Sequence, residues 1–90
     1  MSEVKCIVSG IVQIVMYRSF TERKALSLGL KGTVRNLNDG TVEVVAQGDK
    51  EKLEKLVEHL HGGSLFSRVD NVEVEWREPR ENFADFRILL

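Results

Sequence analysis

The chain has 90 residues, of which 42% are hydrophobic and 30% charged, so it can bury one modest core beneath a charged surface. Thirteen basic and fourteen acidic side chains leave a net charge of -1, which disfavours nucleic acid or an anionic membrane as a partner. We therefore expect a single domain spanning residues 1–90, with neither of these partners.

The cysteine content and the N-terminus indicate where the chain resides. Cys6 is the single cysteine, so it cannot form an internal disulfide, and it lies in an apolar run where a free thiol packs like a small hydrophobic side chain. No secretory signal is visible, and no apolar run approaches the ~18 residues of a membrane span. We expect a soluble, cytoplasmic protein.

The first element is a predicted strand over residues 4–9, because apolar and polar side chains alternate there. Gly10 interrupts this pattern. Residues 11–17 are almost all apolar, so their periodicity alone allows either a continued strand or a loop.

A helix is predicted to begin between Tyr17 and Phe20. Ser19 and Glu22 have the spacing of a capping box, in which the two side chains satisfy the first N–H groups of a helix. Gly29 is suited to end this helix in the left-handed conformation.

A β-hairpin follows. Residues 33–37 form a candidate strand, residues 38–40 read Asn-Asp-Gly, which is strong turn chemistry, and residues 41–47 alternate as a second strand.

The clearest helix of the chain starts after Gly48. Asp49 is the expected N-cap, the apolar residues from Leu53 to Leu60 recur at helical spacing, and a pair of glycines at 62–63 ends the helix. Its charged face is expected to be solvated.

Two further strands complete the pattern. Residues 69–76 alternate as a half-buried strand, and residues 83–90 form a final one. The order βαββαβ, with a short terminal strand, predicts an α+β sandwich of ferredoxin-like type: an antiparallel sheet with two helices on one face.

Two motifs suggest a family. Residues 10–18 read GIVQIVMYR, which agrees with the pattern G-x-V-Q-G-V-x-[FY]-R at six of its seven fixed positions. Residues 32–42 read GTVRNLNDGTV, which agrees fully with G-x-V-x-N-x-x-D-G-x-V. The chain resembles the acylphosphatase family on both motifs, and the similarity extends over nearly all of its length.

The resemblance implies an enzyme that hydrolyses the carboxyl-phosphate bond of a small-molecule acyl phosphate, without a metal or other cofactor. It implies that Arg18 and Asn36 are catalytic, Asn36 by positioning the attacking water. The substrate phosphate, or inorganic phosphate or sulfate in its place, would bind the arginine and the loop amides at Gln13, Ile14, Val15, Met16, Tyr17 and Arg18. We expect a monomer.

Physical chemistry supports these roles. A loop that leads into a helix N-terminus presents unpaired N–H groups and the positive end of the helix dipole to an anion. Arg18 adds a charge-assisted, fork-shaped contact with a phosphate group. His59 and His61 do not share a helix face, and no Cys/His/Asp cluster accompanies them, so a metal site is not expected.

Ile14 leaves two alternatives open, because it stands where the family pattern has glycine. Either the loop keeps the family shape with about 1–3 kcal/mol of strain, or it is rearranged. The second case would give a catalytically weakened or inactive module that binds anions or regulates another protein. An RNA-binding module of the same plan is disfavoured, because residues 41–47 carry no aromatic ring.

Overall fold

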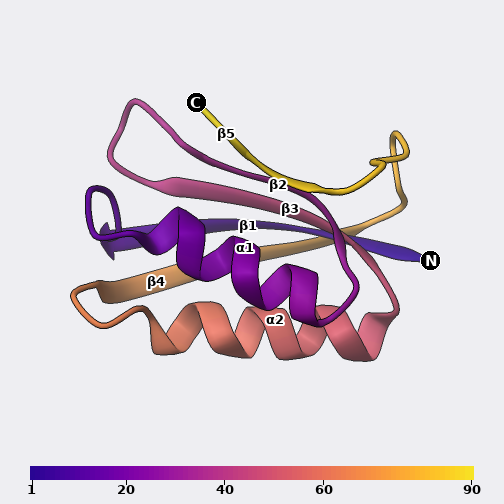
Figure 1. Ribbon diagram of the computed structural model, residues 1–90, viewed down its shortest axis with the longest axis horizontal. Coiled ribbons are helices and arrows are strands. Elements are labelled where there is room, and N and C mark those ends of the chain that lie inside the picture. Colours follow the sequence, from indigo (N-terminus) through magenta and orange to yellow (C-terminus); the bar gives the residue numbers. More distant parts are fainter.

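The computed structural model describes all 90 residues as two helices on one face of a five-stranded sheet (Figure 1). The elements are β1 (Ser2–Ile11), α1 (Tyr17–Ser27), β2 (Lys31–Asn36), β3 (Val42–Gly48), α2 (Lys50–Gly62), β4 (Arg68–Arg77) and β5 (Phe86–Leu89). The ferredoxin-like order βαββαβ is therefore confirmed, and a short strand follows it. Neither helix is long and apolar enough to cross a membrane.

The strands lie in the order β4-β1-β3-β2-β5. The first four pair antiparallel, as predicted, but β5 pairs with β2 in parallel, so the sheet is mixed. The physical reason is that the chain crosses from one edge of the sheet to the other between β4 and β5. It reverses direction on the way, and β5 therefore runs alongside β2 in the same sense.

The core lies between the sheet and the two helices. Most of its fully buried members come from the predicted apolar positions of two central strands and α2: Val4, Cys6, Val8, Val42, Val44, Ala46, Leu53, Leu56 and Leu60. Burial raises the pKa of the Cys6 thiol to about 12. The thiol is therefore neutral at physiological pH and packs as a core side chain, as predicted.

The helix ends differ from the predictions in their side-chain caps. The expected capping box is wrong: Met16 is the N-cap of α1, in the left-handed conformation, its side chain makes no capping bond, and Ser19 lies inside the first turn. Asp49 is the N-cap of α2, but its side chain makes no capping bond either. Gly29, with φ 70°, ends α1 in the left-handed conformation, as predicted.

The outer strand β4 is more exposed than predicted. Val72 is buried, but Val74 and Trp76 on the same face are 38% and 41% exposed. This strand is an edge of the sheet, so no further strand shields these side chains. The Lys50 ammonium lies 5.7 Å from the centroid of the Trp76 ring and covers part of it.

A buried polar cluster lies on the sheet face opposite the helices. Glu3 and Gln47 are paired across β1 and β3 and are 1% and 2% exposed. The Glu3 carboxylate accepts hydrogen bonds from Gln47 Nε2, at 2.8 Å, and from Arg77. Gln47 also donates to the Glu81 carbonyl, so the segment between β4 and β5 covers the cluster.

The cluster sets the ionisation of Glu3. Burial alone would raise the pKa of this carboxyl, but hydrogen bonds from Gln47 and Arg77, together with the Arg77 charge, lower it below its ordinary value. A carboxyl whose pKa is lower in the folded chain stabilises the fold above its unfolded pKa. That stabilisation is lost as the pH falls through the folded pKa.

We therefore predict that Glu3→Gln lowers the free energy of unfolding by about 2 kcal/mol near pH 7. This difference from the wild type should begin to shrink as the pH falls below 4.5, the ordinary pKa of the carboxyl group, and should disappear below the lowered pKa that Glu3 has in the folded chain. Urea unfolding over a series of pH values measures both curves. Glu54→Gln, on the exposed face of α2, is the control. A Glu3→Gln difference that stays constant with pH would contradict the prediction.

Candidate active site

Strand direction brings the two motifs together at the edge of the sheet that is formed by the C-terminal ends of β1 and β2. β1 and β2 are both antiparallel to β3, which lies between them, so their C-terminal ends point the same way. Residues 12–16 follow β1, and Asn36 is the last residue of β2. The parallel strand β5 ends at the same edge. The loop, the β2–β3 turn and the C-terminus accordingly lie at the left of Figure 1.

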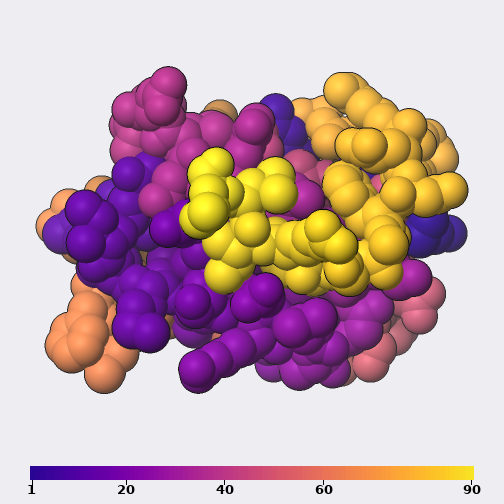
Figure 2. Space-filling model, turned by 45° about the horizontal axis from the view of Figure 1, so that its top comes forward, coloured from indigo at the N-terminus to yellow at the C-terminus, as the bar shows by residue number.

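A pocket of about 340 Å³ lies at this edge. Five of the predicted site residues line it: Ile14, Met16, Tyr17, Arg18 and Asn36. Gln13 and Val15 do not. The other lining residues were not among those predicted: Val12, Ser19, Ile88 and Leu90. The last two come from the end of β5 and the residue that follows it, and this segment lies across the surface beside α1 (Figure 2). Only the pairing of β5 with β2 brings them there.

The loop backbone exposes a set of N–H donors. Ile14 and Met16 both have φ 60°, and left-handed residues that alternate with ordinary ones turn successive N–H groups toward one side. The N–H groups of residues 13–19 donate no hydrogen bond within the protein. The first turn of α1 contains no acidic residue that would compete for them. The arrangement suits an anion.

Ile14 adopts the positive φ that glycine favours, and its side chain is 100% exposed. The sequence left two alternatives, a strained loop and a rearranged one. The structure shows the strained loop, because Ile14 adopts the positive φ. The isoleucine side chain lines the pocket and is fully exposed to solvent there.

Gln13 connects the loop to the turn that follows Asn36. Its Nε2 donates to the carbonyl oxygens of Leu37 and Thr41, at 2.9 and 2.8 Å. The family resemblance implies a role for the Gln13 backbone N–H, but nothing in the sequence reveals this side-chain bridge. The bridge fixes the position of the loop relative to the end of β2.

Val15 and Tyr17 direct their side chains inward. Val15 packs against the core, and Tyr17 is 1% exposed, with its hydroxyl donating to the Leu60 carbonyl at 2.8 Å. Burial raises the pKa of Tyr17, so this hydroxyl stays protonated. These two residues therefore offer the site their backbone N–H groups only.

Arg18 is the only cationic residue that lines the pocket. Its Nη1 donates to the Leu89 carbonyl at 3.3 Å, and the guanidinium pairs with no carboxylate. One contact thus orients the side chain, while most of its five N–H donors remain available. A guanidinium held in this way can contact two oxygens of one phosphate group.

Asn36 has a buried side-chain oxygen, Oδ1, without a hydrogen-bond partner. Leaving such an acceptor unpaired costs about 1–3 kcal/mol, and a water molecule that donates to it would recover this cost. Asp39 instead serves the turn: its carboxylate accepts from the Thr41 N–H and hydroxyl, at 3.0 and 2.6 Å, and these bonds lower its pKa.

No three His, Cys, Asp or Glu side chains lie together in an arrangement that could hold a metal ion. His59 instead stacks on Phe20, with ring centroids 4.2 Å apart.

The fold and this site define an α+β protein with a loop of unpaired N–H groups, one arginine and one asparagine at a single sheet edge. Residues 4–88 agree with the model of one protein family, described as acylphosphatase. The chain belongs to the acylphosphatase family.

Individual relatives agree with this assignment. The acylphosphatase of Thermus thermophilus is 51% identical over 78 residues, which are 87% of this chain and 89% of the relative. That of Methanococcoides burtonii is 48% identical over 81 residues, which are 90% of this chain and 84% of the relative. The crystal structure of acylphosphatase from Bacillus subtilis superposes with a TM-score of 0.97 at 36% identity and covers 100% of both chains.

We predict that Ile14→Gly stabilises the fold by up to about 1 kcal/mol. Glycine removes the strain of a β-branched residue at φ 60°, but it also makes the unfolded chain more flexible, which offsets part of the gain. Because the Ile14 side chain is fully exposed, no packing is lost. Urea unfolding measures the change. The control is Ile11→Gly, which should destabilise, because Ile11 has no positive φ.

Proposed function

We propose that the protein hydrolyses the carboxyl-phosphate bond of acyl phosphates without a metal, with the substrate phosphate bound by Arg18 and the N–H groups of residues 13–17. The observation that carries this proposal is the set of loop N–H groups that donate no hydrogen bond, beside an arginine without an ion-pair partner. Family membership supports the reaction class.

Arg18 is the main determinant of phosphate binding. A charge-assisted contact contributes about 1.5–3 kcal/mol, whereas an exposed helix dipole contributes about 0.3–1 kcal/mol. The loop amides orient the phosphate group, because they bind its oxygens from one side and leave the phosphorus atom open to attack from another.

Asn36 holds the attacking water. Its unpaired Oδ1 accepts a hydrogen bond from the water, and its amide NH₂ can donate to a phosphate oxygen, which aligns the two reactants. An amide cannot take up the proton as a base. Asn36 therefore contributes by alignment, which is a large term in phosphoryl transfer.

The reaction balances without a protein nucleophile. The water oxygen forms a bond to phosphorus while the bond between phosphorus and the acyl oxygen breaks, and the electron pair of that bond leaves with the carboxylate. The proton of the water passes to a phosphate oxygen. Charge that develops on the equatorial phosphate oxygens is stabilised by the loop amides and Arg18, and the carboxylate needs no general acid to leave.

We propose further that residues 1–90 act as a single monomeric domain in the cytoplasm, and that inorganic phosphate or sulfate competes with the substrate for the loop. The buried, unpaired Cys6 is compatible with a reducing compartment.

Arg18→Ala should lower kcat/KM for benzoyl phosphate by about 100-fold or more, because one charge-stabilising donor of an anion site has an effect of this size. Arg18→Lys should recover little of the loss, because an ammonium group lacks the fork of donors. The loss of ultraviolet absorbance of benzoyl phosphate measures the rate. Arg87→Ala, which removes an exposed arginine paired with Asp85, should retain full activity. A wild-type rate in Arg18→Ala would refute its role.

Asn36→Ala should lower kcat by about 100-fold with little change in KM, because Asn36 aligns the water while the phosphate is bound elsewhere. The same change removes an unpaired buried acceptor, so the variant should be at least as stable as the wild type. The activity assay and thermal unfolding test the two effects separately. Asn38→Ala, in the exposed turn, is the control. Parallel losses of activity and stability would indicate a merely structural role.

A further inference from the structure

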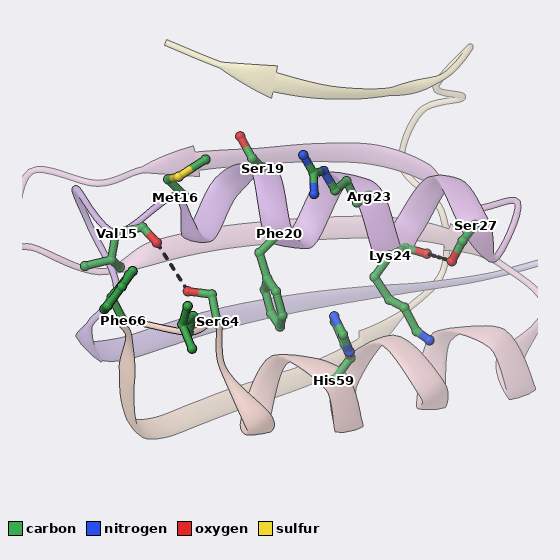
Figure 3. A pocket seen from close by; sticks show the side chains of 11 residues that line it. Val15, Met16, Ser19, Phe20, Arg23, Lys24, Ser27, His59, Ser64 and Phe66 are labelled. Atoms are coloured by element: carbon green, nitrogen blue, oxygen red, sulfur yellow. Dashed lines mark hydrogen bonds between the residues drawn. The ribbon is translucent and has the colours of Figure 1, made fainter.

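A second, larger pocket of about 470 Å³ adjoins the candidate active site. It lies between α1, α2 and residues 64–66 (Figure 3), and Asn36 does not line it. Met16 and Ser19 line both pockets, so the second one begins where the loop enters α1. Nothing in the proposed reaction uses it so far.

The end of this pocket nearest the loop is apolar. Met16, Leu65 and Phe66 line it and are 74%, 88% and 78% exposed, which is unusual for large apolar side chains grouped in one place. Ser64 Oγ donates to the Val15 carbonyl at 3.3 Å and thereby holds the 64–66 segment beside the loop. The exposed apolar surface is thus fixed next to the proposed phosphate site.

A stacked pair of rings lies deeper in the pocket. Phe20 and His59 extend toward each other from α1 and α2 in Figure 3, with centroids 4.2 Å and planes 12° apart. Partial burial and the nearby Lys24 charge lower the pKa of His59, so the neutral ring is favoured at pH 7. The rings present an uncharged aromatic surface.

The far end of the pocket is cationic. Arg23 and Lys24 line it, and neither pairs with a carboxylate. Lys24 follows Met16 by eight residues, or about 12 Å along the helix axis. Their charge attracts an anionic substrate to this side of the molecule.

In-line displacement determines which part of a substrate could enter this pocket. The attacking water and the leaving group lie on opposite sides of the phosphorus atom. Asn36, which we assign to the water, lines only the smaller pocket, whereas the larger pocket lies beyond Met16 and Ser19. We infer that the larger pocket binds the acyl group of the substrate, and that the enzyme prefers acyl phosphates with a bulky, apolar acyl group.

This inference rests on the proposed function, because the pocket has this role only if the phosphate occupies the neighbouring loop. A benzoyl group can contact Met16, Phe66 and the Phe20 ring. The volume of the pocket lies within the range typical of small-molecule sites. An acetyl group has a single methyl and is too short to reach the aromatic surface.

The test compares kcat/KM for benzoyl phosphate and acetyl phosphate in the wild type, Phe66→Ala and Trp76→Ala. We expect the wild type to prefer benzoyl phosphate by about tenfold or more, and Phe66→Ala to reduce this ratio by about tenfold, as a lost apolar contact does. Phe66 is largely exposed on a loop, so its truncation should leave the fold intact. Trp76→Ala truncates an exposed aromatic residue on β4 that does not line the pocket and should leave both rates and the ratio unchanged.

The outcomes separate the inference from the function on which it rests. If the wild type hydrolyses neither substrate, the proposed function fails. If it hydrolyses both, but shows no preference or keeps the same ratio in Phe66→Ala, the phosphate site stands and the acyl pocket is refuted. A ratio that falls in Phe66→Ala and not in Trp76→Ala supports the acyl pocket.

Discussion

The central strand β3 pairs antiparallel with β1 on one side and with β2 on the other. Two hydrogen-bonded ladders thus force two chain segments to end side by side, although more than twenty residues separate them. The loop of residues 12–16 follows the first ladder, Asn36 ends the second, and the Gln13 side-chain amide joins the two ends. Any change that shifts the register of β3 would separate the parts of the site.

Energetically costly features are gathered at this one edge of the sheet. Ile14 and Met16 occupy left-handed backbone, the loop N–H groups are unpaired, and Asn36 has an unsatisfied buried oxygen. Sixteen buried residues form one hydrophobic cluster. The stability that this cluster gives the fold offsets the local costs at the site. Such a distribution, with local violations in one place and consistency in the rest, is what pre-organisation for a ligand requires.

The sequence predicted the elements well, because alternation, helical spacing and turn glycines are local properties. Prediction from the sequence failed where contacts between residues far apart in the chain determine the structure. Ser19 has the spacing of a cap, but the left-handed Met16 starts the helix three residues earlier than such a cap would. Trp76 follows an alternating pattern that cannot reveal that its strand is an edge. The Gln13 bridge depends on the turn after Asn36 and was invisible for the same reason.

The burial of Cys6 has a practical consequence. The Cys6 side chain is 0% exposed and lies in the core between the sheet and the helices. It is the single cysteine of the chain, so no other thiol competes for a reagent. A thiol-specific reagent can reach it only when the sheet separates from the helices. The rate of its modification therefore reports how often the core opens, residue-specifically and without any engineered probe. The enzyme carries its own indicator of conformational fluctuation.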